Sequence, residues 1–132
     1  MTRQLVLLAT GMCLAAGAAH AATNVNTAPV YGTSALASIA CYFSNRSAAT
    51  VTVTGTAIAP DNGGGGLALS SDSCTGASLA AGQGCTFTAA LTNPFGAYFC
   101  HAAVPVAAST GLRLTLENLA ADGSVINTED GR

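Results

Sequence analysis

Cysteine is the residue type whose number and spacing in this chain point most clearly to chemistry. The chain has five cysteines, and those that follow residue 21 are Cys41, Cys74, Cys85 and Cys100. An even number of cysteines in a short exported chain is typical of two disulfides. Four cysteines allow three pairings, of which we favour Cys74–Cys85 and Cys41–Cys100. The first pair brackets the glycine-containing segment 75–84, which lies between two strand-like segments.

Thiol or metal chemistry is the alternative use of these cysteines. The chain contains no Cys-x-x-Cys pair, and His101 is the single histidine after residue 21. Zinc sites are built from closely spaced Cys and His ligands. The spacing therefore favours disulfides and predicts no metal site and no cofactor.

His101 is also the residue on which any histidine-based catalysis would depend. It follows Cys100 directly. Neighbouring residues of a strand point to opposite faces, so the two side chains would not form a nucleophile and its base. The carboxylates of Asp61 and Asp72 show no calcium-binding spacing, and Asp122 is better explained by its turn. We therefore expect a protein without enzymatic activity, and a small enzyme centred on His101 is the less favoured alternative.

The first 21 residues have the pattern of a secretory signal peptide. Arg3 supplies a positive charge, an apolar stretch follows, and Ala19-His20-Ala21 forms a cleavage site. Because the apolar stretch is short for a bilayer span, a signal peptide over residues 1–21 is favoured over a membrane anchor. No later segment of the sequence is long and apolar enough to span a membrane. We expect export to the periplasm or the extracellular medium.

Composition limits the partners that this chain can have. Its 132 residues suit one domain. Only 8% of them are charged, against about 25% in an average globular chain. With four basic residues in all, the chain has no electrostatic surface for nucleic acid. The predicted partner is instead another envelope or secreted protein, and the sequence does not indicate an oligomeric state.

Apolar residues alternate with polar ones along much of the chain, and this alternation indicates that the cysteines and His101 are positioned by β-strands. The clearest example puts Leu112, Leu114 and Leu116 on one face and polar residues on the other. The remaining candidate strands lie around 39–43, 50–54, 67–69, 85–91, 98–102 and 125–127. Turn residues separate them, among them Asn93-Pro94-Phe95-Gly96 and the hairpin signal Asp122-Gly123.

About seven short strands with such turns indicate an all-β fold. We expect a single antiparallel β-sandwich over residues 35–128, stapled by two disulfides. Residues 22–34 are expected to form a flexible N-terminal segment and residues 129–132 a tail.

Strand parity singles out two aromatic residues. If Cys41 and Cys100 face inward, then Tyr42 and Phe99 face outward by the same alternation. Side by side on paired strands, they would form a small apolar patch, and they are our candidate interaction surface. The alternative is that a second sheet covers them.

Two segments carry resemblances to known proteins. Gly96-Ala97-Tyr98-Phe99-Cys100 resembles the Gly-x-Tyr-x-Cys segment of immunoglobulin-type sandwiches, in which the Tyr forms a corner and the Cys bridges to an earlier strand. This resemblance implies an immunoglobulin-like fold, with Cys41 as the partner of Cys100. The chain departs from that family in having no Trp. The segment from Cys74 to Cys85 resembles one found in secreted bacterial β-sandwich modules of unassigned function.

These observations together predict a secreted or periplasmic protein that acts as a binding or envelope-structural module. A second hypothesis is a small disulfide-stapled inhibitor of a secreted hydrolase. In that case segment 75–84 would be the pre-organised inhibitory loop.

Overall fold

The computed structural model describes residues 22–105 and 110–131 of the chain. The predicted signal peptide, residues 1–21, lies outside the described residues, as does Arg132. The described part consists of antiparallel strands and turns, without a helix. It therefore contains no helix that could cross a membrane.

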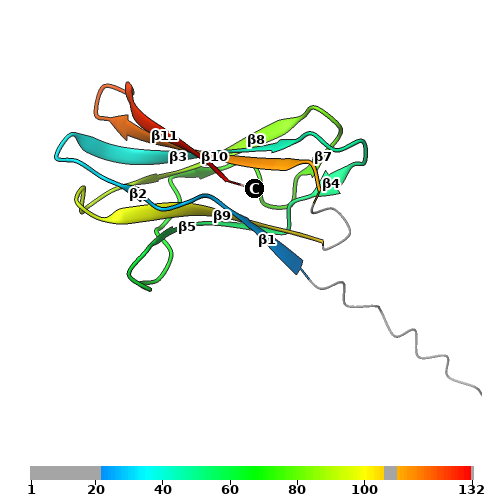
Figure 1. The fold of residues 1–132 in the computed structure, drawn as a ribbon, viewed down its shortest axis with the longest axis horizontal. Coiled ribbons are helices and arrows are strands. Elements are labelled where there is room, and N and C mark those ends of the chain that lie inside the picture. The colour runs from blue at the N-terminus through cyan, green and yellow to red at the C-terminus, as the bar shows by residue number, and fades with distance from the viewer. Residues whose placement is uncertain (1–21, 106–109, 132) are drawn as a thin grey trace, which may run out of the picture.

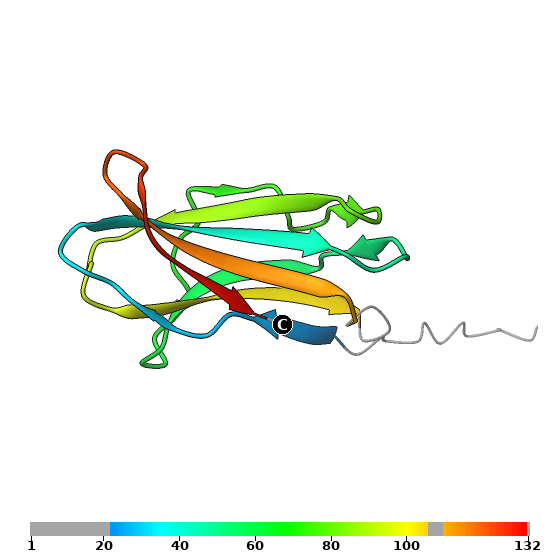
Figure 2. The same cartoon turned by 45° about the horizontal axis from the view of Figure 1, so that its top comes forward.

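Two sheets form two layers that face each other (Figures 1 and 2). The first layer contains β1 (Ala22–Asn26), β2 (Val30–Tyr31), β5 (Gly55–Pro60) and β9 (Ala97–Pro105). In this layer β9 is central, with β5 on one side and β1 and β2 along the other. The second layer contains, in spatial order, β11 (Val125–Gly131), β10 (Leu112–Ala120), β3 (Leu36–Asn45), β8 (Gly84–Ala90) and β6 (Ser71–Asp72). A small third sheet pairs β4 (Val51–Thr52) with β7 (Ser78–Leu79).

The core lies between the two layers and follows the predicted alternation. Every second residue of β9 and of most of β10 is buried. This pattern arises because one face of each strand packs against the opposite layer and the other meets solvent. The largest fully buried apolar side chains are Phe43, Phe87, Ile39, Ile58, Leu114 and Leu116.

Four connections meet at one end of the molecule, which we call the loop end (left in Figure 1). They are segments 32–35, 61–66, 91–96 and 121–124. The last is the predicted Asp122-Gly123 hairpin, which joins β10 to β11 as expected.

The structure corrects the expected strand count and its boundaries. Residues 22–105 and 110–131 form eleven strands rather than about seven. The segment 22–34, expected to be flexible, forms β1 and β2, because both strands pair with β9. β11 continues to Gly131, so residues 129–131 belong to a strand and not to a tail. Segment 67–69, expected as a strand, lies outside the strands.

The chain crosses from one layer to the other between β9 and β10. β10 follows β9 in the chain but pairs with β3 in the opposite layer. In immunoglobulin domains the last strand joins the sheet of the Tyr-x-Cys strand. The chain therefore crosses between layers at a point where those domains do not.

Candidate functional site

The structure separates the two aromatic residues of the predicted interaction surface. Tyr42 is on β3 in the second layer, and Phe99 is on β9 in the first. Their neighbours Cys41 and Cys100 are joined between the layers, so the two aromatic side chains point outward on opposite faces. The expectation that they lie side by side on paired strands is therefore wrong. Tyr42 is 41% exposed, and Phe99 is half-buried.

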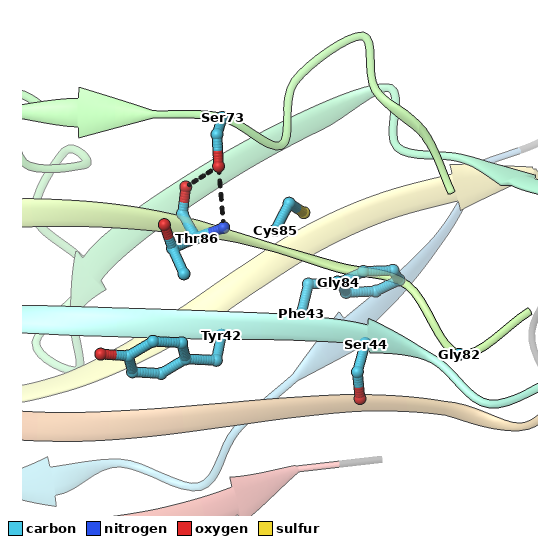
Figure 3. A pocket seen from close by; sticks show the side chains of 8 residues that line it. All are labelled: Tyr42, Phe43, Ser44, Ser73, Gly82, Gly84, Cys85 and Thr86. Atoms are coloured by element: carbon cyan, nitrogen blue, oxygen red, sulfur yellow. Dashed lines mark hydrogen bonds between the residues drawn. The ribbon is translucent and has the colours of Figure 1, made fainter. Parts of the chain in front are cut away.

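Tyr42 lines a shallow hollow of about 480 Å³ on the outer face of the second layer (Figure 3). We call it the Tyr42 hollow. Its other lining residues include Ser44, Ser73 and Thr86. The Ser73 hydroxyl donates a hydrogen bond to the Thr86 carbonyl and accepts one from the Thr86 N–H, both at 2.9 Å. Partial burial raises the pKa of Tyr42, and the negative charge of Glu117 raises it further. The hollow is therefore a neutral surface rich in hydroxyl groups.

Both predicted disulfides are confirmed. Cys41–Cys100 joins β3 to β9 with a Cα–Cα distance of 6.0 Å, and Cys74–Cys85 has one of 5.1 Å. All four sulfur atoms are bonded, so these cysteines offer no free thiol. Two disulfides are typical of an oxidising compartment such as the periplasm or the extracellular space. Among residues 22–105 and 110–131, no group of His, Cys, Asp or Glu side chains is arranged to hold a metal ion.

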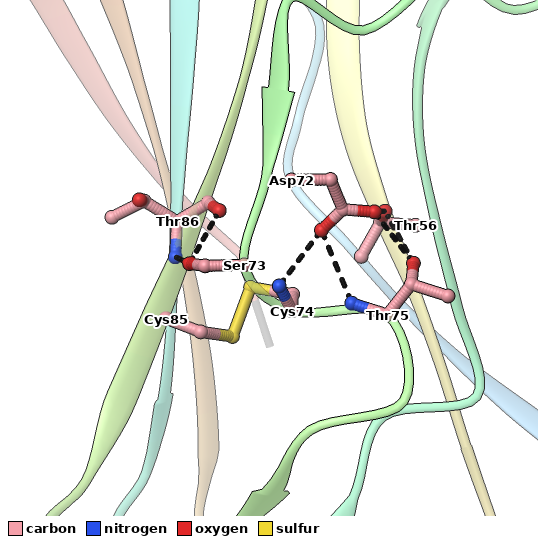
Figure 4. The surroundings of a disulfide bond; sticks show 7 residues. All are labelled: Thr56, Asp72, Ser73, Cys74, Thr75, Cys85 and Thr86. Carbon is pink, nitrogen blue, oxygen red and sulfur yellow. Dashed lines mark hydrogen bonds between the residues drawn. A yellow bond between two sulfur atoms is a disulfide. The ribbon is translucent and has the colours of Figure 1, made fainter.

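Asp72 organises the backbone around the Cys74–Cys85 disulfide (Figure 4). Its Oδ1 accepts hydrogen bonds from the N–H groups of Cys74 and Thr75, and its Oδ2 accepts from the hydroxyls of Thr56 and Thr75. Desolvation acts to raise the pKa of Asp72. The hydrogen bonds outweigh it and hold that pKa below its ordinary value, because they favour the ionised carboxylate. Asp72 is thus a structural residue of the 72–75 turn.

Segment 75–84 packs against the body of the protein. Its strand β7 pairs with β4, and the buried Asn45 donates a 2.9 Å hydrogen bond to the carbonyl of Leu79. The carbonyl of Asn45 in turn accepts a 2.7 Å bond from the N–H of Gly82. These contacts hold the segment along its length, so its backbone does not project as a free loop.

His101 has a local partner on the neighbouring strand. Its Nδ1 lies 2.9 Å from Oδ1 of Asn26, directly across the β1–β9 pair. This hydrogen bond ties β1 to β9 on the outer face of the first layer. Cys100, the preceding residue, faces the core, as strand parity predicts.

A second concave surface lies at the loop end, and the sequence did not single it out. This groove, of about 260 Å³, is lined by Tyr31, Pro60, Asp61, Asn62, Asn93, Gly96, Ala97 and Tyr98. We call it the Tyr31 groove. The side chain of Tyr31 is 73% exposed, and that of nearby Phe95 is 70% exposed. Large apolar side chains are costly to leave in water, so two exposed aromatic rings on segments joined by the Gly32–Gly96 hydrogen bond make this end of the molecule a candidate binding surface.

The backbone of the Tyr31 groove is held by hydrogen bonds between its segments. The N–H of Gly32 bonds to the carbonyl of Gly96 at 2.9 Å, and the N–H of Asp61 to that of Ala97 at 2.9 Å. A Cβ atom at Gly32 would lie 1.8 Å from the carbonyl oxygen of Pro94. Only glycine therefore allows the segment after β2 to approach the 91–96 turn this closely.

Phe99 lies at the diagonal position to Tyr31 on the outer face of the first layer. Tyr31 pairs with Ala97, and Phe99 follows on the same face of β9. This diagonal spacing is within reach of aromatic side chains. The signal that could have identified this surface is Val30-Tyr31, two residue types that favour strands, inside the segment expected to be flexible.

We compared the chain with protein-family models, with curated proteins and with solved structures, and none of the three comparisons found a match.

Proposed function

We propose that this protein is an exported, non-enzymatic binding module that acts in the periplasm or the extracellular space. The pattern of residues 1–21 supports export, and the two disulfides support an oxidising compartment. Its partner is material of the envelope or another secreted protein.

The exposure of Tyr31 and Phe95 on a hydrogen-bonded frame is the observation that carries this proposal. Exposed tyrosine rings are common at binding surfaces because they offer a large contact area with few rotatable bonds. A frame held in place before binding loses little conformational entropy on binding. The Tyr31 groove is therefore the proposed binding surface. The Tyr42 hollow offers one half-exposed ring and is the weaker candidate.

We also propose that the two layers form a single sandwich related to the immunoglobulin type. Two features support this relation. The Tyr98 hydroxyl donates a 2.7 Å hydrogen bond to the carbonyl of Asn93, five residues upstream, as in a tyrosine corner. The Cys41–Cys100 bridge links two strands in opposite layers. The pairing of β10 with β3 makes this a variant of that fold.

The inhibitor hypothesis receives less support. An inhibitory loop would enter the cleft of its target enzyme, and segment 75–84 is instead bonded along its length to β4 and Asn45.

Co-sedimentation of the exported protein with insoluble envelope material of its source tests the proposal. We expect the wild type to be retained, and Tyr31→Ala to lower retention about tenfold, as loss of an aromatic anchor does. Tyr42→Ala is the matched control, because it removes an exposed tyrosine from the other layer, and it should be retained like the wild type. The proposed surface would be wrong if the wild type and both variants were retained equally, or if none of the three were retained.

A further inference from the structure

The Tyr31 groove combines an aromatic ring with amide and carboxylate groups. Tyr31 stands on β2 with 73% of its side chain exposed. The face of such a ring is flat, apolar and electron-rich. It therefore suits a ligand that presents a flat face of C–H groups, as a pyranose ring does.

The polar side chains of the groove are positioned by their own turns. Oδ1 of Asn93 accepts a 3.1 Å hydrogen bond from the N–H of Phe95. Oδ1 of Asn62 accepts a 3.2 Å bond from the N–H of Gly64. These bonds fix both amides by their oxygen atoms. Each Nδ2 group carries two N–H donors, and neither Nδ2 makes a hydrogen bond within the described residues.

Asp61 supplies the complementary acceptor. It is exposed and lies beside Asn62 in the lining of the groove. An ionised carboxylate only accepts hydrogen bonds. The groove thus offers amide donors and carboxylate acceptors around one aromatic ring. Adjacent hydroxyl groups of a sugar, each both donor and acceptor, match this set.

The distribution of charge around the Tyr31 groove disfavours an anionic ligand. Asp61 and Asp122 are both in loop-end segments. The arginines of the described residues, Arg46 and Arg113, lie at the opposite end, where β3 ends and β10 begins. A phosphate or uronic acid group in the groove would meet negative charge with no basic side chain beside it. A neutral ligand avoids this repulsion.

The size of the groove favours a sugar unit over a protein surface. Its volume is about 260 Å³, just below the range of about 300–1,000 Å³ of drug-sized ligand pockets, so it would hold a single sugar ring of a longer chain. A stable protein interface needs about 800 Å² from each partner, and the lining of this groove is much smaller than that.

We infer that the Tyr31 groove binds a neutral saccharide chain, with one sugar ring stacked on Tyr31 and its hydroxyl groups bonded to Asp61, Asn62 and Asn93. This inference rests on the proposed binding function and names its ligand class. It assigns the four side chains the roles of platform, acceptor and two donors.

Titration of the exported protein with soluble polysaccharides tests this inference. The neutral probes are oligomers of β-1,4-glucose, β-1,3-glucose, α-1,4-glucose and N-acetylglucosamine, and polygalacturonate is the anionic probe. Binding is followed by calorimetry and by NMR shifts of backbone amides. We expect at least one neutral oligomer to bind with shifts confined to segments 30–32, 60–64 and 91–98, and polygalacturonate not to bind.

Variants identify the residues responsible. Tyr31→Ala should weaken binding about tenfold or more, as expected for an anchor residue, whereas Tyr31→Phe keeps the ring and should retain most of the affinity. Asp61→Ala and Asn93→Ala should each weaken binding as well. Tyr42→Ala is the control and should bind like the wild type. Because Tyr31 is exposed, its substitution leaves the core intact, and amide spectra confirm the fold of each variant.

The outcomes separate this inference from the proposed function. If no neutral oligomer binds while envelope retention still depends on Tyr31, the saccharide is wrong and the binding module stands. If Tyr31→Ala changes neither retention nor titration, both are wrong. If polygalacturonate binds as tightly as the neutral oligomers, the argument from charge fails and the saccharide class must be revised.

Discussion

The hydroxyl of Tyr98 donates a 2.7 Å hydrogen bond to the backbone carbonyl of Asn93. This bond ties the start of β9 to the 91–96 turn, which contributes Asn93 to the Tyr31 groove. Tyr98 is itself buried. A Cβ atom at Gly96 would lie 2.8 Å from its ring, so the turn closes tightly over it. One side chain therefore connects the core to the frame of the proposed binding surface.

Removing this hydroxyl should loosen the turn. We predict that Tyr98→Phe lowers the free energy of unfolding by about 1 kcal/mol, the usual net contribution of one hydrogen bond. Urea unfolding measures the change. Tyr42→Phe, which removes a hydroxyl from the exposed outer face, is the matched control and should change stability less. If the two substitutions lowered the free energy of unfolding equally, the Tyr98–Asn93 hydrogen bond would contribute no more to stability than an exposed hydroxyl does.

The two disulfides should differ in their contributions to stability. They close loops with sequence separations of 59 and 11 residues. In the chain-entropy model the first contributes about 4 kcal/mol and the second about 3 kcal/mol. We predict that Cys41→Ala/Cys100→Ala costs more stability in urea unfolding than Cys74→Ala/Cys85→Ala. Equal or reversed costs would contradict this order. Alkylation of the exported protein, cleaved after Ala21, should leave its mass unchanged unless the disulfides are first reduced.

Much of the fold could be predicted because its signals are local. The alternation of Leu112, Leu114 and Leu116 sets which face of β10 is buried, and the burial of all three confirms it. The even number of cysteines after residue 21 predicted two disulfides, and segment 75–84 between Cys74 and Cys85 favoured one of the three possible pairings, the one that is observed. These features depend on residues close together in the sequence or on simple counting.

The strands that were missed depend on distant partners. β1 and β2 are strands because they pair with β9, a strand far along the chain (Ala22 with Pro105, Tyr31 with Ala97), and no local alternation marks them. The Tyr31 groove was missed for the same reason. Tyr31 belongs to β2, whereas Asp61 and Asn93 belong to two separate connections, and only the strand pairing brings the three residues together. Likewise, parity placed Tyr42 and Phe99 outward, but it could not say in which layer each strand lies.

The stability of the protein should fall in acid partly through Asp72. Hydrogen bonds hold its folded pKa below the ordinary value of 3.8. The unfolded state therefore binds a proton before the folded state does as the pH falls. Its contribution is fully present above this ordinary value and is lost as the pH falls through the folded pKa. We predict that the stability difference between wild type and Asp72→Asn is constant near neutral pH and shrinks below pH 3.8.

Urea unfolding across the acid range measures this difference. Thr56→Val is a matched control, because it removes one of the hydroxyl donors to Asp72 and should reduce the pH-dependent loss without abolishing it. A stability difference that does not change with pH would contradict the assigned hydrogen-bond network.

Tyr42 should ionise at an unusually high pH. Partial burial raises its pKa above 10.0, and the carboxylate of Glu117 raises it further. We predict that Glu117→Gln lowers the pKa of Tyr42 without returning it to the ordinary value, because the desolvation of the ring by burial remains. The ionisation of each tyrosine is followed by NMR as the pH rises. A pKa unchanged by the substitution would show that Glu117 does not act on the ring.

Two buried asparagines, Asn45 and Asn118, have opposite hydrogen-bonding environments. Asn118 is 1% exposed, and its Oδ1 has no hydrogen-bond partner in the described part of the chain. Asn45 is fully buried, and its amide bonds to the carbonyls of Ala49 and Leu79 and to both the N–H and the hydroxyl of Ser47. An unpaired buried polar atom costs about 1–3 kcal/mol, whereas a fully bonded one stabilises the fold.

Leucine at the two positions should therefore have opposite effects. We predict that Asn118→Leu raises the free energy of unfolding by about 1 kcal/mol, because it removes the unpaired oxygen and adds apolar contact. Asn45→Leu should lower it by several times that amount, since it leaves two backbone carbonyls without donors. Urea unfolding of both variants measures the contrast. If Asn118→Leu destabilises the protein as Asn45→Leu does, the Asn118 amide takes part in bonding that stabilises the folded state.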